Sequence, residues 1–189
     1  MKSKQVLRCI AAMLAVVSYP SFAQTSNYPN RPVRMVVPFP PGGGTDIVAR
    51  LVMPKLSENL GQSIIIDNRG GANGGIGSDI AAKAQADGYT VLVGGIGTMA
   101  INFAMYSKIP YDPVRDFAGV TQIAGVPNML VVNPSLGPTS VKELIALVKS
   151  KPGQLNFSTP GAGSSDHMSM ELFKLRAGLN IVHIPYKGF

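Results

Sequence analysis

Cysteine is almost absent from this sequence. The 189 residues contain a single one, Cys9, close to the start of the chain. One thiol cannot form an internal disulfide or a cysteine-based metal site, and at Cys9 it falls within a segment that we expect to be removed, which excludes a thiol nucleophile in the mature protein. The stability of the mature chain must therefore come from packing.

Long apolar runs are also missing. The run from Cys9 to Val17 falls far short of the roughly 20 residues that a membrane-spanning helix needs, and every later candidate is interrupted by glycine, proline or charge. The run follows Lys2, Lys4 and Arg8 and precedes Ser21-Phe22-Ala23, a pattern typical of an export signal. We expect residues 1–23 to be a signal peptide cut between Ala23 and Gln24. A lipid anchor is excluded because Cys9 opens the apolar core instead of ending it.

The sequence has no clustered positive charge. Its net charge is +7, and removal of the signal takes away three basic residues and no acidic one, which leaves +4. The other lysines and arginines are scattered, without interleaved aromatic residues, so we expect no nucleic-acid partner. The two histidines lie 16 residues apart with no carboxylate cluster beside them. We therefore expect no metal site.

Glycine, by contrast, is abundant and is concentrated in loops. Four times a short apolar run ends in glycines and hydroxyl residues and then opens into a helix-like stretch, at residues 36–46, 68–75, 94–98 and 159–165. A helix start has unpaired backbone N–H groups and a partial positive charge, so it can hold an anion without a charged side chain. The four loops predict a binding site for a small acid.

The first half of the chain alternates between strand and helix patterns. We expect strands at 34–37, 63–67 and 90–93, the second of them buried, and helices at 46–60 and 76–84. Thr45 or Asp46 is the expected N-cap of the first helix, and Gly61 its end. This order predicts a parallel sheet with ligand loops at the carboxyl ends of its strands.

A second series follows a proline-rich break. Strands are expected at 129–132, 155–158 and 181–184, and helices at 141–150 and 166–176, the first of these with a capping box at Ser140. We therefore expect two α/β lobes, residues 24–126 and 127–189. The chain ends directly after a strand, so the second lobe is expected to be incomplete and the sequence cut short.

Two nucleotide-binding interpretations are disfavoured. The loop at 42–46 lacks the lysine of a P-loop, and Asp46 would repel phosphate. The stretch from Gly95 to Ala100 formally fits a dinucleotide pattern, but the acidic residue expected after the next strand is absent. We expect no cofactor.

Ser164, Ser165, Asp166 and His167 contain the residue types of a serine hydrolase. Neighbours at a helix start point around its circumference and cannot form a triad, and no G-x-S-x-G motif is present. A capped helix start lining a cleft is the preferred interpretation, with His167 as a ligand contact or a partly buried polar residue. His183 is expected to be structural. An exported serine hydrolase is retained as the alternative.

Several blocks of the sequence together closely resemble the Bug-type receptors of tripartite tricarboxylate transporters. The blocks are Tyr28-Pro29, Arg31 to Arg34, Val36 to Arg50, Asp87 to Thr90, Pro110 to Phe117, Val131 to Pro134 and His183 to Gly188. The resemblance implies a type II periplasmic-binding fold: two α/β lobes that close on a ligand in the cleft between them. It also implies a periplasmic receptor, not an enzyme, that delivers its ligand to membrane permease subunits.

The resemblance further implies which residues bind. The ligand would be a small carboxylate: a di- or tricarboxylate, an acidic amino acid or an aromatic acid. The implied contacts are Pro41, Gly42, Gly43, Gly44, Thr45, Asp46, Gly97, Thr98, Asn102, Gly161, Gly163, Ser164, Ser165 and His167. Such receptors continue well past Gly188, and Phe189 stands where a small polar residue is more usual, so a non-functional receptor fragment is a further alternative.

Overall fold

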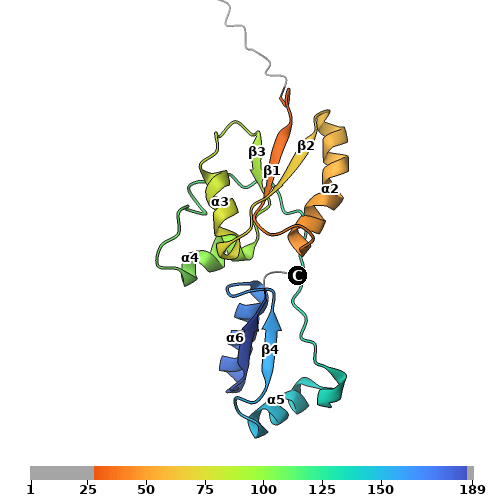
Figure 1. The fold of residues 1–189 in the computed structure, drawn as a ribbon, viewed down its shortest axis with the longest axis vertical. Coiled ribbons are helices and arrows are strands. Elements are labelled where there is room, and N and C mark those ends of the chain that lie inside the picture. Colours follow the sequence, from red (N-terminus) through yellow and green to blue (C-terminus); the bar gives the residue numbers. More distant parts are fainter. Residues whose placement is uncertain (1–27, 187–189) are drawn as a thin grey trace, which may run out of the picture.

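Two separate parallel sheets organise residues 28–186, the part of the chain that the computed structural model describes (Figure 1). The first sheet has the order β2-β1-β3, with strands Val33–Val37 (β1), Ile64–Asn68 (β2) and Thr90–Leu92 (β3). The second pairs Asn156–Thr159 (β4) with Val182–Pro185 (β5). Every pairing is parallel, which confirms the expected α/β class.

The first lobe, from β1 to α4, is built on the three-stranded sheet. Its helices are Gly44–Leu60 (α2), Gly75–Ala82 (α3) and Asn102–Met105 (α4). α2 packs Met53, Leu56 and Leu60 against a core that includes Val33, Met35 and Val37 of β1. It ends where predicted, because Gly61 adopts a left-handed conformation with φ of 65°.

The order of the strands places the glycine loops. From central β1 the chain crosses to β2 on one side, and β3 then pairs on the other side of β1. The loops after β1 and β3 therefore diverge at a topological switch point, where open α/β sheets bind ligands. Two of the three predicted loops of the first lobe, residues 36–46 and 94–98, lie there.

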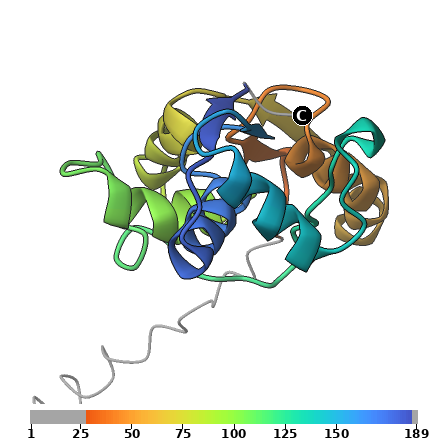
Figure 2. The ribbon, with the colours of Figure 1, turned by 90° about the horizontal axis from the view of Figure 1, so that it is seen from below.

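The second lobe, from α5 to β5, contains Val141–Ser150 (α5) and Ser165–Ala177 (α6) around β4 and β5 (Figures 1 and 2). Leu144, Val148, Leu179 and Ile181 form its buried core. Ser140 caps α5 by accepting a hydrogen bond from the Glu143 N–H, as the predicted capping box requires. The Glu143 carboxylate bonds to the N–H and hydroxyl of Thr139, one residue earlier than the box specifies.

Three local predictions are wrong. No strand forms at 129–132; in this stretch Met129 and Val131 are largely exposed, and no neighbouring strand pairs with it in the described part of the chain. β2 is an edge strand, and of its residues only Ile64 is buried. The N-cap of α2 is Gly43, not Thr45 or Asp46, because the helix begins two residues earlier than expected.

The lobes are joined by a segment without helix or strand from residue 118 to 133, which contains the expected boundary at 126/127. The expected signal peptide and its cut site lie outside the described residues, as do Lys187, Gly188 and Phe189. No helix among residues 28–186 combines the length and hydropathy that crossing a bilayer requires.

Candidate functional site

The loop after β1 leads directly into α2 and leaves the start of this helix open. Gly43 precedes the helix in an extended conformation, and no side chain bonds to the N–H groups of the first turn. Gly42 adopts φ of 84°, a region that favours glycine. Nothing lies within 4 Å of the position where a Cβ would stand at Gly42 or Gly44. The first turn of α2 therefore offers backbone donors and space to an anion.

Asp46 lies directly beneath this loop and is only 2% exposed. Its carboxylate accepts hydrogen bonds from the Gly42 N–H (2.8 Å), Arg50 Nε (2.8 Å) and Asn68 Nδ2 (3.0 Å). The Arg50 guanidinium, with these two further donors, outweighs burial and holds the pKa of Asp46 well below its usual range. The carboxylate is thus ionised and used internally, where it fixes the shape of the loop.

The loop after β3 buries the side chains of Thr98 and Asn102. Thr98 Oγ1 bonds to both the N–H and the carbonyl of Gly95, at 3.1 and 3.0 Å. Asn102 Nδ2 donates to the Tyr111 hydroxyl at 3.3 Å, and this hydroxyl donates to the Thr98 carbonyl at 2.6 Å. Both predicted side chains hold the loop together, so they support its backbone.

Asn73 was not among the predicted site residues, although it occupies a central position. Its Nδ2 donates to Asn102 Oδ1 at 2.8 Å and to the Gly163 carbonyl of the second lobe at 2.9 Å. Its backbone is left-handed, with φ of 50°. An asparagine among the glycines of residues 70–75 was the available signal, since asparagine tolerates this conformation better than most residues.

The predicted loop of the second lobe starts α6. Ser164 is the N-cap, and its hydroxyl accepts a hydrogen bond from the His167 backbone N–H at 3.2 Å. The Gly163 N–H donates to His167 Nδ1 at 3.2 Å, and the Ser165 hydroxyl donates to Asn128 Oδ1. The His167 ring therefore accepts a hydrogen bond from the backbone of the loop. In the described structure neither Ser164 nor Ser165 donates a hydrogen bond to this ring.

His167 also belongs to a stack of rings. It lies parallel to His183 with ring centroids 4.0 Å apart, and His183 stacks on Phe157 at 4.7 Å. His183 Nε2 lies 2.7 Å from the Thr159 hydroxyl. Burial, followed by the nearby His167, lowers the pKa of His183. His183 is thus a packed residue, as expected, beneath the loop of the second lobe.

Three of the four glycine loops converge across the lobes. A Cβ at Gly97 would stand 3.4 Å from Asn73 Nδ2 and 3.7 Å from the Gly163 carbonyl oxygen. The loop after β1 contacts the loop after β2: a Cβ at Gly74, in the second of these loops, would stand 3.2 Å from the ring of Phe39 in the first. No contact of this kind places Gly161 close to the first lobe in the described structure; its Cβ position faces the Tyr186 carbonyl.

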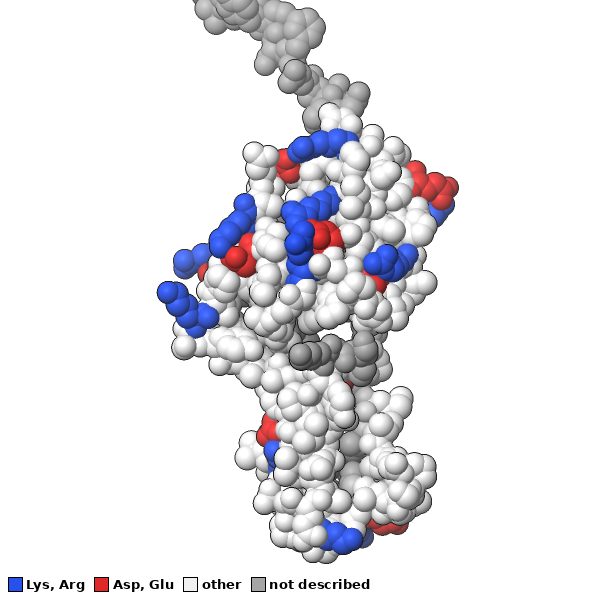
Figure 3. Space-filling view, viewed as in Figure 1, with Lys and Arg blue, Asp and Glu red and all other residues white. Residues whose placement is uncertain are grey.

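The charged side chains of the first lobe are largely paired with one another. On the face shown in Figure 3, basic and acidic groups lie beside one another on the first lobe. Arg34 and Arg69 both pair with Asp67, and Arg31 pairs with Asp87. Since these charges are paired, an anion at the loops would be held mainly by backbone N–H groups.

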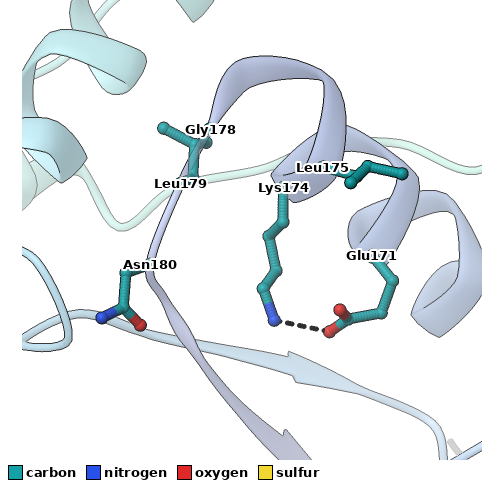
Figure 4. Close-up of a pocket in the computed structure, with 6 residues that line it drawn as sticks. All are labelled: Glu171, Lys174, Leu175, Gly178, Leu179 and Asn180. Atoms are coloured by element: carbon teal, nitrogen blue, oxygen red, sulfur yellow. Dashed lines mark hydrogen bonds and ion pairs between the residues drawn. The ribbon is translucent and has the colours of Figure 1, made fainter.

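An open depression of about 450 Å³ lies elsewhere, around the carboxyl end of α6 (Figure 4). It is lined by Glu171, Lys174, Leu175, Gly178, Leu179 and Asn180. Lys174 and Glu171 pair with each other within it at 2.7 Å. No glycine loop contributes to this depression, so it is not the candidate site.

Residues 48–189 match the family model described as the tripartite tricarboxylate transporter family receptor. The chain belongs to this family. Protein BugT of Bordetella pertussis is 40% identical over 189 residues, which cover 100% of this chain and 58% of BugT. The receptor family expected from the sequence blocks is thereby confirmed.

Solved structures of receptors of this kind match the fold. A Rhodopseudomonas palustris protein with adipate is 46% identical, with a TM-score of 0.81, and the match covers 85% of this chain and 54% of that one. MatC of the same organism, with bound malate, is 34% identical, with a TM-score of 0.77 and coverage of 85% and 55%. A third neighbour, 42% identical with a TM-score of 0.80 and coverage of 85% and 54%, is described as a periplasmic transporter.

These comparisons also limit which properties of the relatives can be assigned to this chain. It spans little more than half the length of the relatives that it matches. The family and its neighbours are solute-binding receptors, not enzymes, so the alternative of a serine hydrolase is wrong. Which residues contact a ligand stays a prediction.

Proposed function

We propose that this protein is a periplasmic receptor that captures a small dicarboxylate, or a related carboxylate, for delivery to the permease of a tripartite tricarboxylate transporter. The observation that carries the proposal is the open, uncapped start of α2 at the switch point of the first sheet. Its backbone donors suit a carboxylate, and the ionised Asp46 beneath it is already neutralised by Arg50.

The second lobe would supply a further set of donors. The start of α6, where Ser164 caps the helix beside Gly163, lies across from the loop after β3. A dicarboxylate has two anionic ends and so can engage one helix start on each lobe. Adipate and malate in the two solved neighbours have this chemistry. Export by the predicted signal, residues 1–23, would bring the receptor to the periplasm, where its relatives work.

Thermal unfolding of the chain with a panel of carboxylic acids tests the proposal. A ligand at 100 times its dissociation constant adds about 2.7 kcal/mol of stability. For a chain of this size the melting temperature would then rise by about 5–10 °C. We expect adipate or malate to produce this rise and a monocarboxylate such as acetate not to. A cooperative transition that no acid raises would refute the receptor function, and the absence of any transition would favour the non-functional fragment.

A further inference from the structure

The carboxamide of Asn73 lies where loops from both lobes meet. Its Nδ2 has two hydrogens and two acceptors: Asn102 Oδ1 at 2.8 Å on the first lobe and the Gly163 carbonyl oxygen at 2.9 Å on the second. Among the described residues, no other hydrogen bond or ion pair joins residues 28–126 to residues 127–186. Separation of the lobes must therefore break the bond from Asn73 to Gly163.

The first lobe holds this donor in position before any contact with the second. Asn73 is in a left-handed conformation and makes two hydrogen bonds with the side-chain amide of Asn102. Asn102 Nδ2 donates to the backbone carbonyl of Asn73 at 3.1 Å, and Asn102 Oδ1 accepts from the Asn73 side chain. Tyr111 bonds both to Asn102 and to the Thr98 carbonyl. The carboxamide is thus anchored in a buried polar network that also shapes the loop after β3.

The acceptor belongs to the proposed ligand loop of the second lobe. Gly163 is buried and has φ of 81°, and a Cβ there would stand 2.8 Å from Asn73 Nδ2. Its N–H bonds to His167 Nδ1, and the next residue, Ser164, caps α6. The bond from Asn73 therefore positions the start of α6 against the first lobe.

We propose that Asn73 is the positioning residue that latches the two lobes together and so sets the closed geometry of the ligand site. The part of this inference that concerns affinity rests on the function proposed above, whereas the latch itself does not. A contact made only when the lobes are together stabilises that state, so its loss lowers the apparent affinity for any ligand that the closed state binds.

Distance measurement between two spin labels tests the latch directly. The labels are placed at Lys55→Cys on α2 and Lys149→Cys on α5, two exposed positions on different lobes, in a Cys9→Ser background that removes the only native thiol. N73D keeps the side-chain size but cannot donate to Gly163, and N73G removes the side chain and suits the left-handed backbone. N156D makes the same chemical change as N73D at an exposed position of β4 and is the matched control.

We expect the unliganded chain and N156D to share one narrow distance distribution, and N73D and N73G to show a broader or longer one. With adipate as the probe, loss of one hydrogen bond should raise koff by about two- to tenfold while kon changes little. A role confined to local stability would lower the melting temperature without changing the distances. If N73D does not fold, N73G decides the question alone.

Unchanged distances in folded N73G would overturn the latch. The two proposals can fail separately. If adipate does not bind the parent chain, the receptor function fails for this acid, and the distances without added acid still decide the latch. If adipate binds the parent and N73G with equal koff and equal distances, the receptor function stands and the latch is wrong.

Discussion

At the scale of single residues, we expect His183 to make the stability of the second lobe depend on pH. It is packed between Phe157 and His167, with Thr159 bonded to its ring and Glu171 and Lys174 nearby on α6. Burial is the main cause of its lowered pKa, and His167 adds to it, while Glu171 opposes it. Folding therefore favours neutral His183, whereas the unfolded chain binds a proton near the ordinary pKa of about 6.5.

The sign of the effect follows from this difference. Stability contributed by His183 is present above pH 6.5 and is lost as the pH falls, because protons then bind preferentially to the unfolded state. We expect the urea midpoint to decline between pH 7.5 and 5.5, and to decline less in His183→Gln, whose amide can still bond to Thr159. Equal declines in the two chains would show that His183 does not cause the pH dependence.

The role of Asp46 shows what sequence reasoning could reach at this scale. The loop was predicted from its glycines and from the strand and helix around it, all of which are local signals. Asn68, which binds the Asp46 carboxylate, lies 22 residues away, at the end of β2. The ion pair of Asp46 with Arg50, four residues along α2, is a local signal, whereas only the parallel pairing of β1 with β2 brings Asn68 to Asp46, so this contact could not be predicted from spacing. The same holds for Asn73 and Gly163, which are 90 residues apart.

At the scale of elements, two serine-capped helices of the second lobe offer a matched pair. Ser140 caps α5 and Ser164 caps α6, each through a hydrogen bond to the N–H three residues later. Loss of such a cap costs about 1 kcal/mol. We expect Ser140→Ala and Ser164→Ala to lower the free energy of unfolding by similar amounts, measured by urea denaturation.

Their effects on ligand binding should differ. Ser164 belongs to the proposed ligand loop, whereas Ser140 starts a helix whose buried residues face the core of the second lobe. Calorimetric titration with adipate should therefore show weaker binding to Ser164→Ala and parent-like binding to Ser140→Ala. Equal affinities in both variants would remove the start of α6 from the ligand site.

Helices and strands were predicted well where residues within the element determine it, and poorly where the element depends on pairing with another strand. Gly61 ends α2 and Ser140 starts α5 as expected, because glycine and serine act within one helical turn. The run at 129–132 has the apolar, β-branched composition of a strand, but a strand also needs a neighbour with which to pair. Among the described residues no strand pairs with this run, so its composition alone led to a wrong prediction.

At the scale of the whole molecule, the segment between the lobes exposes several large apolar side chains. Val120, Val126, Met129 and Val131 are all at least 75% exposed. Further exposed apolar residues lie on the second lobe, among them Leu175 on α6 and Val182 on β5. Exposed apolar side chains promote association where they gather into patches. The two short sheets add strand edges that carry unpaired backbone groups.

We therefore expect this chain to self-associate as its concentration rises, and the connecting segment to contribute. Val126 and Val131 are largely exposed and contribute little to the core. Replacing both with lysine should therefore leave the melting temperature nearly unchanged, while the added charge opposes association. Sedimentation velocity at two concentrations measures the effect: the parent should shift to larger species and the double variant should shift less. A matched change on a helix, Leu51→Lys on α2, where the side chain is 74% exposed, controls for added charge. If the double variant instead loses several degrees of stability, these valines are covered in solution, and the segment is part of a packed interface.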